Sequence, residues 1–396
     1  MRNANDRWRT LVIAAVFMGL MSASSPAAAE KSWKDETVLV SPKGGETVVR
    51  AFEGDKVLFK NADAQLAIEW GLANARTTVV LAGKYVICDR IDIPRDDVTL
   101  IIDKDAELAL NPDTTAHTYE MGFRPIGSWK RLCMIYNRHR NNVRVISLGT
   151  IRPWRVRPPK DEAWTRKNRK GTPYRGTWPI FFDGRNPKRT CGIQGGFLLT
   201  AGSMGDAIWL LDCSGMEVSL IAHKFGGDGS IVLEGCEDIN LGMLVNLATT
   251  PGGKTGEVID LNGRDKAITI ERAIGERPNE IVDNNSSYVD VGEVVSIGMP
   301  QNPRSKKNQK GGLIKFAGGG DGARYTSRPR FRRTALNVEK QTILENAASA
   351  ALKLEAPKLP DDLPCFTVKA TVEVQMKDGS KKEYTKEVEI DVREGG

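Results

Sequence analysis

Two aspartates occupy equivalent places in a repeated stretch between residues 205 and 244. Asp206 and Asp228 each follow a glycine, stand 22 residues apart and precede a short apolar run. If the two copies fold as stacked strands, like positions lie about 4.8 Å apart. Two carboxylates at that spacing repel, so one keeps its proton and can act as a general acid while the other acts as a base. This pairing suits glycoside hydrolysis, and we predict it at Asp206 and Asp228.

Two other interpretations of this repeat stay open. An aspartate flanked by glycines also forms turns, in which its side chain accepts hydrogen bonds from backbone N–H groups and has no catalytic role. Lys224, preceded by His223, is a candidate base for β-elimination from a uronate, with Arg264 or Arg272 neutralising the substrate carboxylate. The structural alternative for these cations is a solvated surface.

The repeat itself predicts the scaffold. Short apolar runs separated by tight turns recur along the chain, which is typical of a solenoid built from stacked coils. One set of expected strands comprises 208–211, 231–233, 258–261 and 281–282, and a second comprises 216–221, 239–244, 267–270 and 289–295. In the first set we place Trp209, Leu211, Leu233 and Leu261 inside.

If these residues lie inside, a set of polar residues in the same strands faces outward. Alternation of side chains along a strand then predicts an outward ladder of Asp212, Glu234 and Asn262, with Asp260 beside it. These residues are candidate substrate ligands. Glu234, Asp260 and Asp283 also form a possible oxygen-ligand set for Ca²⁺. Apart from that cation, we expect no metal or cofactor, because the six cysteines lack zinc-ligand spacing.

A basic, aromatic segment interrupts the repeat between residues 152 and 178. It contains nine basic residues against two acidic ones, and four prolines. Tryptophans stack on sugar rings and arginines bind carboxylates or sulfates, so Trp154, Arg155 and Trp164 are candidate ligands for an anionic polysaccharide. The alternatives are single-stranded nucleic-acid binding, which export disfavours, and a solvated loop whose tryptophans pack on the solenoid.

The N-terminus has the features of a secretory signal. Three arginines precede the apolar run 11–20, and Ala27, Ala28 and Ala29 provide a cleavage site of small residues. The run is too short for a good membrane span, so we expect a secreted or periplasmic protein without a span after cleavage, an uncleaved anchor being the alternative. Export permits disulfides. Cys213 and Cys236, at near-equivalent places in adjacent coils, either bond or stack as buried thiols.

Residues 63–110 carry a family resemblance. Asp63 begins a short helical segment, and Val79, Leu81, Gly83, Tyr85 and Ile87 then alternate before further strands. This pattern resembles the N-terminal cap and first coil of pectin-lyase-like right-handed parallel β-helix proteins. The resemblance implies the fold, and it leaves the activity open because that superfamily contains lyases, hydrolases, epimerases and non-enzymatic proteins.

The two aspartates are also similar in placement to the acidic motifs of family 28 polygalacturonase-like hydrolases. In that family Asn-Thr-Asp is followed one coil later by Gly-Asp-Asp, whereas this chain has Met204-Gly205-Asp206 and Gly226-Gly227-Asp228. The resemblance implies Asp206 as the acid and Asp228 as the base that activates water. The chain lacks the Asn-Thr pair, the first aspartate of the second motif, and the later Gly-His-Gly and Arg-Ile-Lys motifs.

We therefore expect an all-β chain with one single-stranded right-handed parallel β-helix. The expected parts are a signal peptide (1–29), an N-terminal cap with a short helix (30–75), the β-helix (76–330) with a basic insertion (152–195), and a C-terminal cap (331–396). In that last part we predict a helix over 336–354 and a hairpin around Asp378-Gly379, together covering the end of the solenoid. The predicted function is cleavage of an anionic polysaccharide by hydrolysis, with a lyase and a non-catalytic glycan-binding or cell-envelope protein as alternatives.

Overall fold

The computed structural model describes fourteen stretches of the chain. They are residues 32–88, 90–111, 133–152, 178–185, 192–205, 208–223, 225–226, 229–247, 257–262, 265–276, 281–283, 287–298, 314–316 and 336–393. Within them the chain is mostly β, with parallel sheets and the single helix α2 (Ala64–Asn74). The all-β class expected from the sequence is therefore confirmed.

Most strands belong to two large sheets, and successive coils of the chain contribute strands to both. The larger has twelve strands, ordered β25-β23-β21-β19-β16-β13-β10-β7-β4-β1-β2-β3. Their bounds are β1 (Thr37–Lys43), β2 (Glu46–Ala51), β3 (Val57–Asn61), β4 (Thr77–Val80), β7 (Thr99–Ile102), β10 (Val143–Ser147), β13 (Ile193–Thr200), β16 (Cys213–His223), β19 (Glu237–Asn246), β21 (Lys266–Gly275), β23 (Ser287–Ile297) and β25 (Leu336–Leu344).

The second large sheet has eight strands, ordered β24-β22-β20-β18-β15-β12-β9-β6. Their bounds are β6 (Ile91–Asp92), β9 (Cys133–Arg138), β12 (Trp178–Asp183), β15 (Ile208–Leu211), β18 (Ile231–Glu234), β20 (Ile259–Leu261), β22 (Ile281–Asp283) and β24 (Ile314–Phe316). Two small parallel sheets accompany them: one of β5 (Gly83–Ile87), β8 (Ala106–Leu110) and β11 (Thr150–Arg152), and one of β14 (Met204–Gly205) and β17 (Phe225–Gly226).

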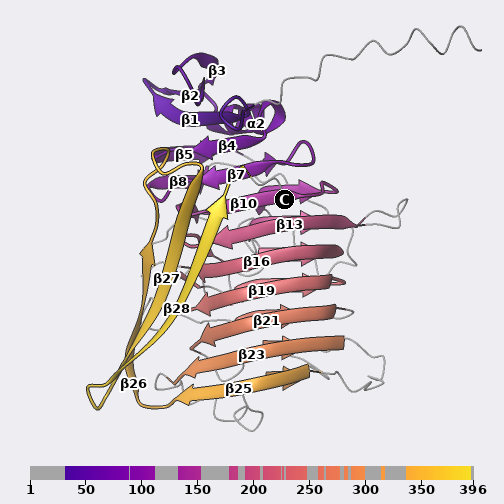
Figure 1. Cartoon of the computed structure of the whole chain (residues 1–396), viewed down its shortest axis with the longest axis vertical. Helices are drawn as coiled ribbons and strands as arrows, with labels where there is room; N and C mark the ends of the chain where they lie inside the picture. The colour runs from indigo at the N-terminus through magenta and orange to yellow at the C-terminus, as the bar shows by residue number, and fades with distance from the viewer. Residues whose placement is uncertain are drawn as a thin grey trace, which may run out of the picture.

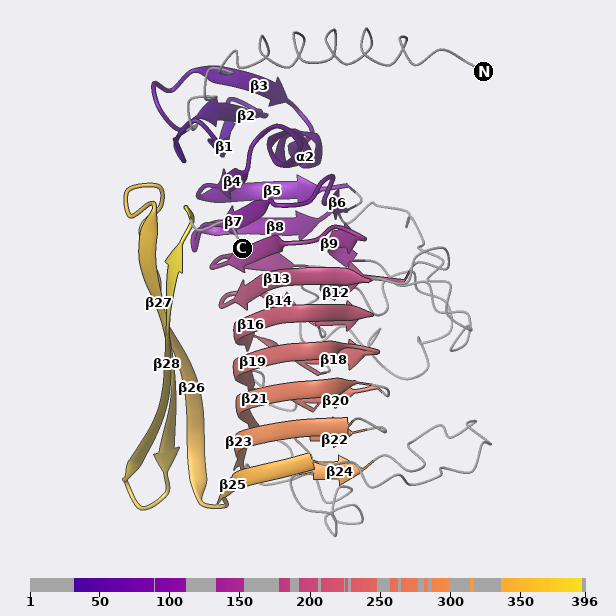
Figure 2. The same cartoon turned by 45° about the vertical axis from the view of Figure 1, so that its right-hand side comes forward.

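The chain passes from one large sheet to the other and back, and each pass stacks on the one before (Figures 1 and 2). From β4 to β25 every pairing within these sheets is parallel and joins strands of successive coils. Apolar side chains from both sheets fill the space between them as one continuous core, which includes Val145 of the twelve-stranded sheet and Phe182 and Leu233 of the eight-stranded sheet. The two strand sets predicted from the repeat are both present.

The strand register corrects one sequence prediction. Leu210 pairs with Leu233, and Leu233 pairs with Leu261, so these three leucines share the inner row. Trp209 and Leu211, which we predicted inside, belong instead to a separate apolar cluster on the outer face of the eight-stranded sheet. The 22-residue spacing of the repeat predicts that Leu211 is equivalent to Leu233, whereas in the structure Leu210 is. A shift of one residue in register moves every side chain of a strand to the other face.

The N-terminal end of the stack is closed by α2 and the antiparallel strands β1 to β3 (Figure 1). Asp63 is the N-cap that the sequence predicts, because its carboxylate accepts from the backbone N–H of Gln65 at 2.9 Å. Ala67, Ile68 and Leu72 turn into the core, while the ring of Trp70 stacks on that of Phe59. The helix therefore covers the first coil.

The C-terminal segment differs from its prediction. In place of a helix over 336–354 the chain forms β25 and then β26 (Ala347–Glu355), because residues 336–344 continue the stack by pairing with β23. In β26, Ala350, Leu352 and Leu354 alternate with more exposed residues, a strand period rather than a helical one. The predicted hairpin is confirmed as β27 (Cys365–Met376) and β28 (Lys381–Asp391), with Gly379 at a φ of +87° in the turn.

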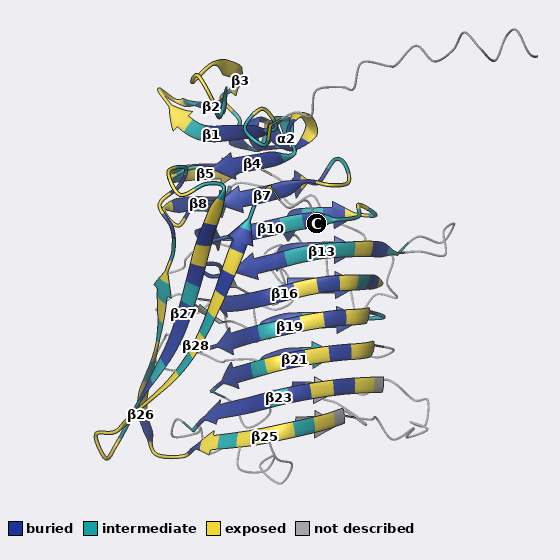
Figure 3. Ribbon diagram, viewed as in Figure 1, coloured by how far each residue is buried: buried dark blue, intermediate teal, exposed yellow. Residues whose placement is uncertain are grey.

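Strands β26, β27 and β28 form an antiparallel sheet that lies along the side of the stack (Figures 1 and 2). Its apolar side chains, including Val368, Val372 and Val374, pack against those on the outer face of the twelve-stranded sheet, such as Leu220 and Met243. Figure 3 shows the resulting buried band on the stacked strands beside this sheet. The C-terminal segment therefore covers a face of the stack, whereas we predicted that it closes an end.

Candidate functional site

The outer face of the eight-stranded sheet carries a cluster of aromatic side chains. Trp178, Phe181 and Trp209 are buried there with Cys133 and Leu211, and Tyr136 packs against them. The ring centroids of Trp178 and Trp209 lie 3.9 Å apart, and those of Phe181 and Trp209 lie 5.2 Å apart. Parallel pairing brings these rings together, because Tyr136, Phe181 and Trp209 occupy one row across three successive strands.

Polar side chains lie in this row and in the next row on the same face. The row of Trp209 leads through Val232 to Asp260. The neighbouring row contains Asp183, Leu211 and Glu234. Glu234 and Asp260 are both half-buried, and Asn262, one residue after β20, is exposed. The face therefore joins an aromatic region to an acidic one, and we name it the aromatic–acidic face.

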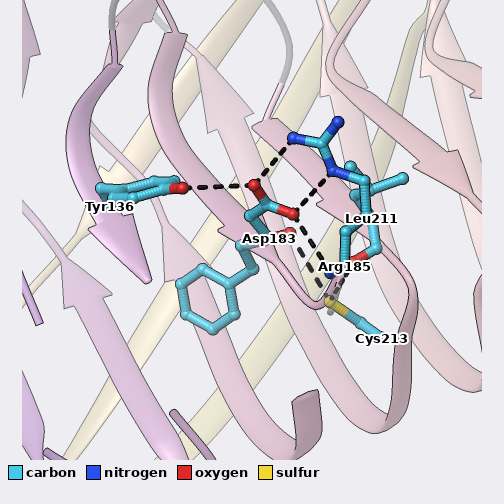
Figure 4. A network of polar contacts seen from close by, with 6 residues as sticks. Tyr136, Asp183, Arg185, Leu211 and Cys213 are labelled. Carbon is cyan, nitrogen blue, oxygen red and sulfur yellow. Dashed lines mark hydrogen bonds and ion pairs between the residues drawn. The ribbon is translucent and has the colours of Figure 1, made fainter. Parts of the chain in front are cut away.

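A hydrogen-bonded network of Tyr136, Asp183 and Arg185 lies on this face (Figure 4). Arg185 donates from Nε to Oδ1 of Asp183 at 2.9 Å and from Nη2 to Oδ2 at 2.8 Å, a bidentate contact. The Tyr136 hydroxyl donates to Oδ2 at 3.2 Å, and the backbone N–H of Arg185 donates to Oδ1 at 3.1 Å. Asp183 is nearly buried, with 5% of its surface exposed, and these donors satisfy its negative charge.

The network shifts the ionisation of its members. Burial raises the pKa of Tyr136, and the charge of Asp183 raises it further, so the phenol stays protonated. Burial lowers the pKa of Arg185, but its hydrogen bonds with Asp183 outweigh that effect and the net shift is upward. The charge of Glu234 also raises this pKa, so its carboxylate lies close enough to act on the guanidinium. Arg185 therefore links Asp183 to the acidic end of the face.

A second arginine completes this region. The guanidinium of Arg90 lies 4.3 Å from the ring centroid of Tyr136 and forms an ion pair with Asp92. Asp92 pairs with Tyr136 across β6 and β9. Both charges of the pair thus lie at the aromatic end of the face, where a cation over the ring fixes the position of Tyr136.

The predicted outward ladder is correct in part. Glu234 lies on the outer face, but its partner in the preceding strand is Leu211 and not Asp212. Asp212 lies in the turn after β15 with a φ of +49°, and its backbone N–H donates to the carbonyl of Glu234 at 2.9 Å. The ladder of Asp212, Glu234 and Asn262 is therefore not formed as predicted. The reason is the one-residue difference between the predicted and the observed register, which also places Leu211 on the outer face.

The predicted acid–base pair lies outside the described residues, but its flanking strands do not. Asp206 follows Gly205, and Asp228 stands two residues after Gly226; Gly205 and Gly226 pair across β14 and β17. After these segments, Ile208 pairs with Ile231 at the start of the eight-stranded sheet. Each of the two segments is therefore preceded and followed by a strand that pairs with the equivalent strand of the neighbouring coil.

Of the residues of the lyase hypothesis, the structure describes Arg272 and the backbone of His223. Lys224 and Arg264 lie outside the described residues, and His223, whose backbone ends β16, pairs with Asn246. Arg272 lies on β21 of the other large sheet, where its Nε donates to Glu293 at 3.0 Å and its guanidinium packs on the Tyr384 ring. Arg272 therefore helps to fasten the C-terminal sheet and does not belong to the aromatic–acidic face.

The remaining predicted ligands are Trp154, Arg155 and Trp164, which lie outside the described residues. Asp283 pairs with Leu261, so its backbone position continues the inner row of Leu233 and Leu261 and not the outer row of Asp260. Within the described stretches, no three His, Cys, Asp or Glu side chains gather as a metal site. Cys213 and Cys236 are buried thiols and do not form a disulfide. No described helix has the length and hydrophobicity to cross a membrane.

Sequence reasoning missed the Tyr136–Asp183–Arg185 network, because its members come from different coils and only the register joins them. One local signal was available. Asp183 ends an apolar strand and precedes Gly184 and Arg185, a pattern in which the aspartate accepts from a backbone N–H two residues later.

Comparisons with known proteins give little. No family model matches the sequence, and no curated protein matches it. Among solved structures, the chain has a match to a "putative glycosyl hydrolase" from Parabacteroides merdae, at 12% sequence identity over 70% of this chain and 85% of that chain. The TM-score of this match is 0.28, which is too low to carry an argument about fold or function.

Proposed function

We propose that this chain is an exported, carbohydrate-active protein that binds an anionic polysaccharide along the aromatic–acidic face and cleaves it by acid–base hydrolysis. We further propose that its stack is a right-handed parallel β-helix. Asp206 acts as the acid and Asp228 as the base. The observation that carries the proposal is the bracketing of these two aspartates by paired strands, β14 with β17 and β15 with β18, at the edge of this face.

The face has chemistry suited to a sugar polymer. Carboxylates such as Glu234 and Asp260 accept hydrogen bonds from hydroxyl groups, and Arg185 supplies a positive charge that acts on Glu234. These groups come from successive strands, so a polymer that runs along the stack meets them in turn. We propose a secreted or periplasmic location, because the N-terminal sequence has the features of a secretory signal.

The lyase alternative has less support, because Arg272, one of its two candidate guanidiniums, is engaged by Glu293 on the other sheet. Non-catalytic binding has a specific observation in its favour. Asp183, the most buried carboxylate of the face, is held by Arg185 and Tyr136 and so acts as a structural anion. A glycan-binding protein would need only the face, without Asp206 and Asp228 as catalysts.

A substrate screen of the mature protein separates these functions. Pectate, alginate, sulfated galactans and glycosaminoglycans would each be incubated with protein, and both new reducing ends and ultraviolet absorbance would be followed. The proposal predicts reducing ends without absorbance, since only β-elimination leaves an unsaturated uronate. Absorbance would identify a lyase, whereas retention of polymer without either signal would identify a binding protein.

A further inference from the structure

An open cleft of about 340 Å³ lies where the two ends of the described chain meet, away from the aromatic–acidic face. Three segments that are distant in sequence form it: the turn before β1, the start of β4, and the residues after β28. Trp33, Glu36, Arg76 and Arg393 supply its aromatic and charged lining. The cleft is complete only when the C-terminal sheet is docked on the first coils.

The N-terminal part of the lining is held by local contacts. The Trp33 ring packs on Phe52, with centroids 4.9 Å apart, and the Trp33 carbonyl accepts from the Thr37 hydroxyl at 2.6 Å. Arg76 is fixed through its backbone, whose carbonyl accepts from the N–H of Thr99 at 2.8 Å. Its Nη1 lies 3.8 Å from Glu36 Oε2, which is beyond hydrogen-bond distance. The pair is therefore loose enough for Arg76 to bind another carboxylate.

Hydrogen bonds hold the C-terminal part of the lining. Arg393 donates from Nε to Asp391 Oδ1 at 3.0 Å and from Nη2 to the sulfur of Cys365 at 3.1 Å. These contacts orient the guanidinium, and its hydrogen bonds hold the pKa of Asp391 well below the usual range for a carboxyl. The lining thus presents two guanidinium groups and one carboxylate beside an indole.

We propose that this cleft binds a single negatively charged sugar residue, a uronate unit of a polysaccharide. The indole of Trp33 would pack on the apolar face of the ring, and Arg76 would bind the carboxylate through charge-assisted hydrogen bonds. The Nη1 group of Arg393, whose Nε and Nη2 are held by Asp391 and Cys365, would add one more hydrogen bond. Glu36 would accept from a hydroxyl group. A cleft of this volume is at the small end of ligand sites, which fits one ring. The site goes beyond the proposed function, because it holds a polymer without cleaving it.

The test is a titration of the ¹⁵N-labelled mature protein that follows the indole N–H signal of Trp33. That signal is assigned to Trp33 because it is absent from the spectrum of the Trp33→Phe variant. D-galacturonate is expected to shift it, whereas D-galactose and inorganic phosphate are not. Arg76→Gln should weaken the binding of galacturonate about tenfold, as loss of a charge-assisted hydrogen bond implies. Lys84→Gln removes an equal charge from an exposed site on the first coil and should change nothing.

Three outcomes would overturn the inference: no shift with galacturonate, an equal shift with galactose or phosphate, or unchanged affinity in Arg76→Gln. A thermal scan of Arg76→Gln confirms that the variant is folded. Because the measured signal comes from a residue in the cleft, a negative titration would contradict the cleft proposal without contradicting the proposed hydrolysis. An active protein whose Trp33 signal does not move would contradict the cleft alone.

Discussion

The two large sheets of the stack have contrasting outer faces. On the outer face of the twelve-stranded sheet, a mainly aliphatic band that includes Leu220 and Met243 is covered by the chain's own C-terminal sheet. The outer face of the eight-stranded sheet carries aromatic rings, carboxylates and two arginines, and the C-terminal sheet does not cover it (Figure 2). The same coils therefore present one face that packs on the C-terminal sheet and another that carries aromatic and charged groups, because side chains alternate between the faces of a strand.

The largest effect should come from disrupting the covered face. Val368→Asn places an amide among aliphatic side chains in the interface between the C-terminal sheet and the stack. We expect the free energy of unfolding to fall by roughly 3 kcal/mol or more. Thr367→Asn, one residue away on the exposed side of β27, should cost under about 1 kcal/mol. Urea unfolding of both variants checks this, and equal losses would contradict the docking.

A second pair of variants tests which side of the eight-stranded sheet is the core. Leu233 is fully buried in the inner row, whereas its neighbour Val232 is half-buried on the outer face. Leu233→Ala should lower the free energy of unfolding by about 2–5 kcal/mol, and Val232→Ala by about 1 kcal/mol or less. Denaturant unfolding measures both. A larger loss in Val232→Ala would mean that the assigned register is wrong.

Arg272→Gln should cost about 1–3 kcal/mol at pH 7, because Glu293 is left with fewer donors. Burial raises the pKa of Glu293, but hydrogen bonds from Lys340, Arg272 and Thr342 outweigh it and lower the pKa overall. A lowered carboxyl pKa contributes stability above its unfolded value of about 4.5, and that stability is lost as pH falls through the folded value. The difference from wild type should therefore shrink in acid.

Urea midpoints at pH 7 and near pH 3 test this prediction. Lys266→Gln is the control, since the ion pair of Lys266 with Glu237 is exposed on both sides and should contribute little. A constant difference between Arg272→Gln and wild type across this pH range would show that Glu293 is not the group responsible.

Tyr136→Phe should have the smallest effect, about 0.5–1.5 kcal/mol, from the lost hydrogen bond to Asp183. Burial and then the charge of Asp183 raise the pKa of Tyr136 above its ordinary value of 10.0. The resulting stability is fully present below about pH 10 and is lost as pH rises through the folded pKa. Wild type should therefore lose more stability than the variant above pH 10.

Unfolding midpoints between pH 8 and 10.5 measure that difference. Tyr288→Phe, at a tyrosine that is 66% exposed, should follow wild type throughout. If Tyr136→Phe and wild type kept the same separation across this range, Tyr136 would not be held neutral by the network.

Local signals in the sequence predicted the local elements. Asp63 as an N-cap and Asp378-Gly379 as a turn each act within a few residues, and the structure contains the helix and the hairpin they predict. The alternating apolar runs likewise predicted the two strand sets. These features depend on backbone geometry alone, which the sequence encodes directly.

What the sequence did not predict depends on contacts between coils. The pairing of Leu211 with Glu234, the strand β26 in place of a helix, and the contact of Tyr136 with Asp183 across 47 residues all require the register. The loops of the repeat differ in length, so the spacing of its motifs does not determine the register, and the predicted register differs from the observed one by one residue. Long-range packing decided these points against local propensity.

The central claim is that Asp206 and Asp228 form an acid–base pair beside the aromatic–acidic face. The most direct measurement is the rate at which reducing ends are released from the substrate found in the screen, by wild type, Asp206→Asn and Asp228→Asn. Asp238→Asn is the matched control, an exposed aspartate near the start of β19 at a φ of +58°, which asparagine tolerates. We predict that both catalytic variants lose release about 100-fold or more while the control keeps it. Wild-type rates in either catalytic variant would contradict the account.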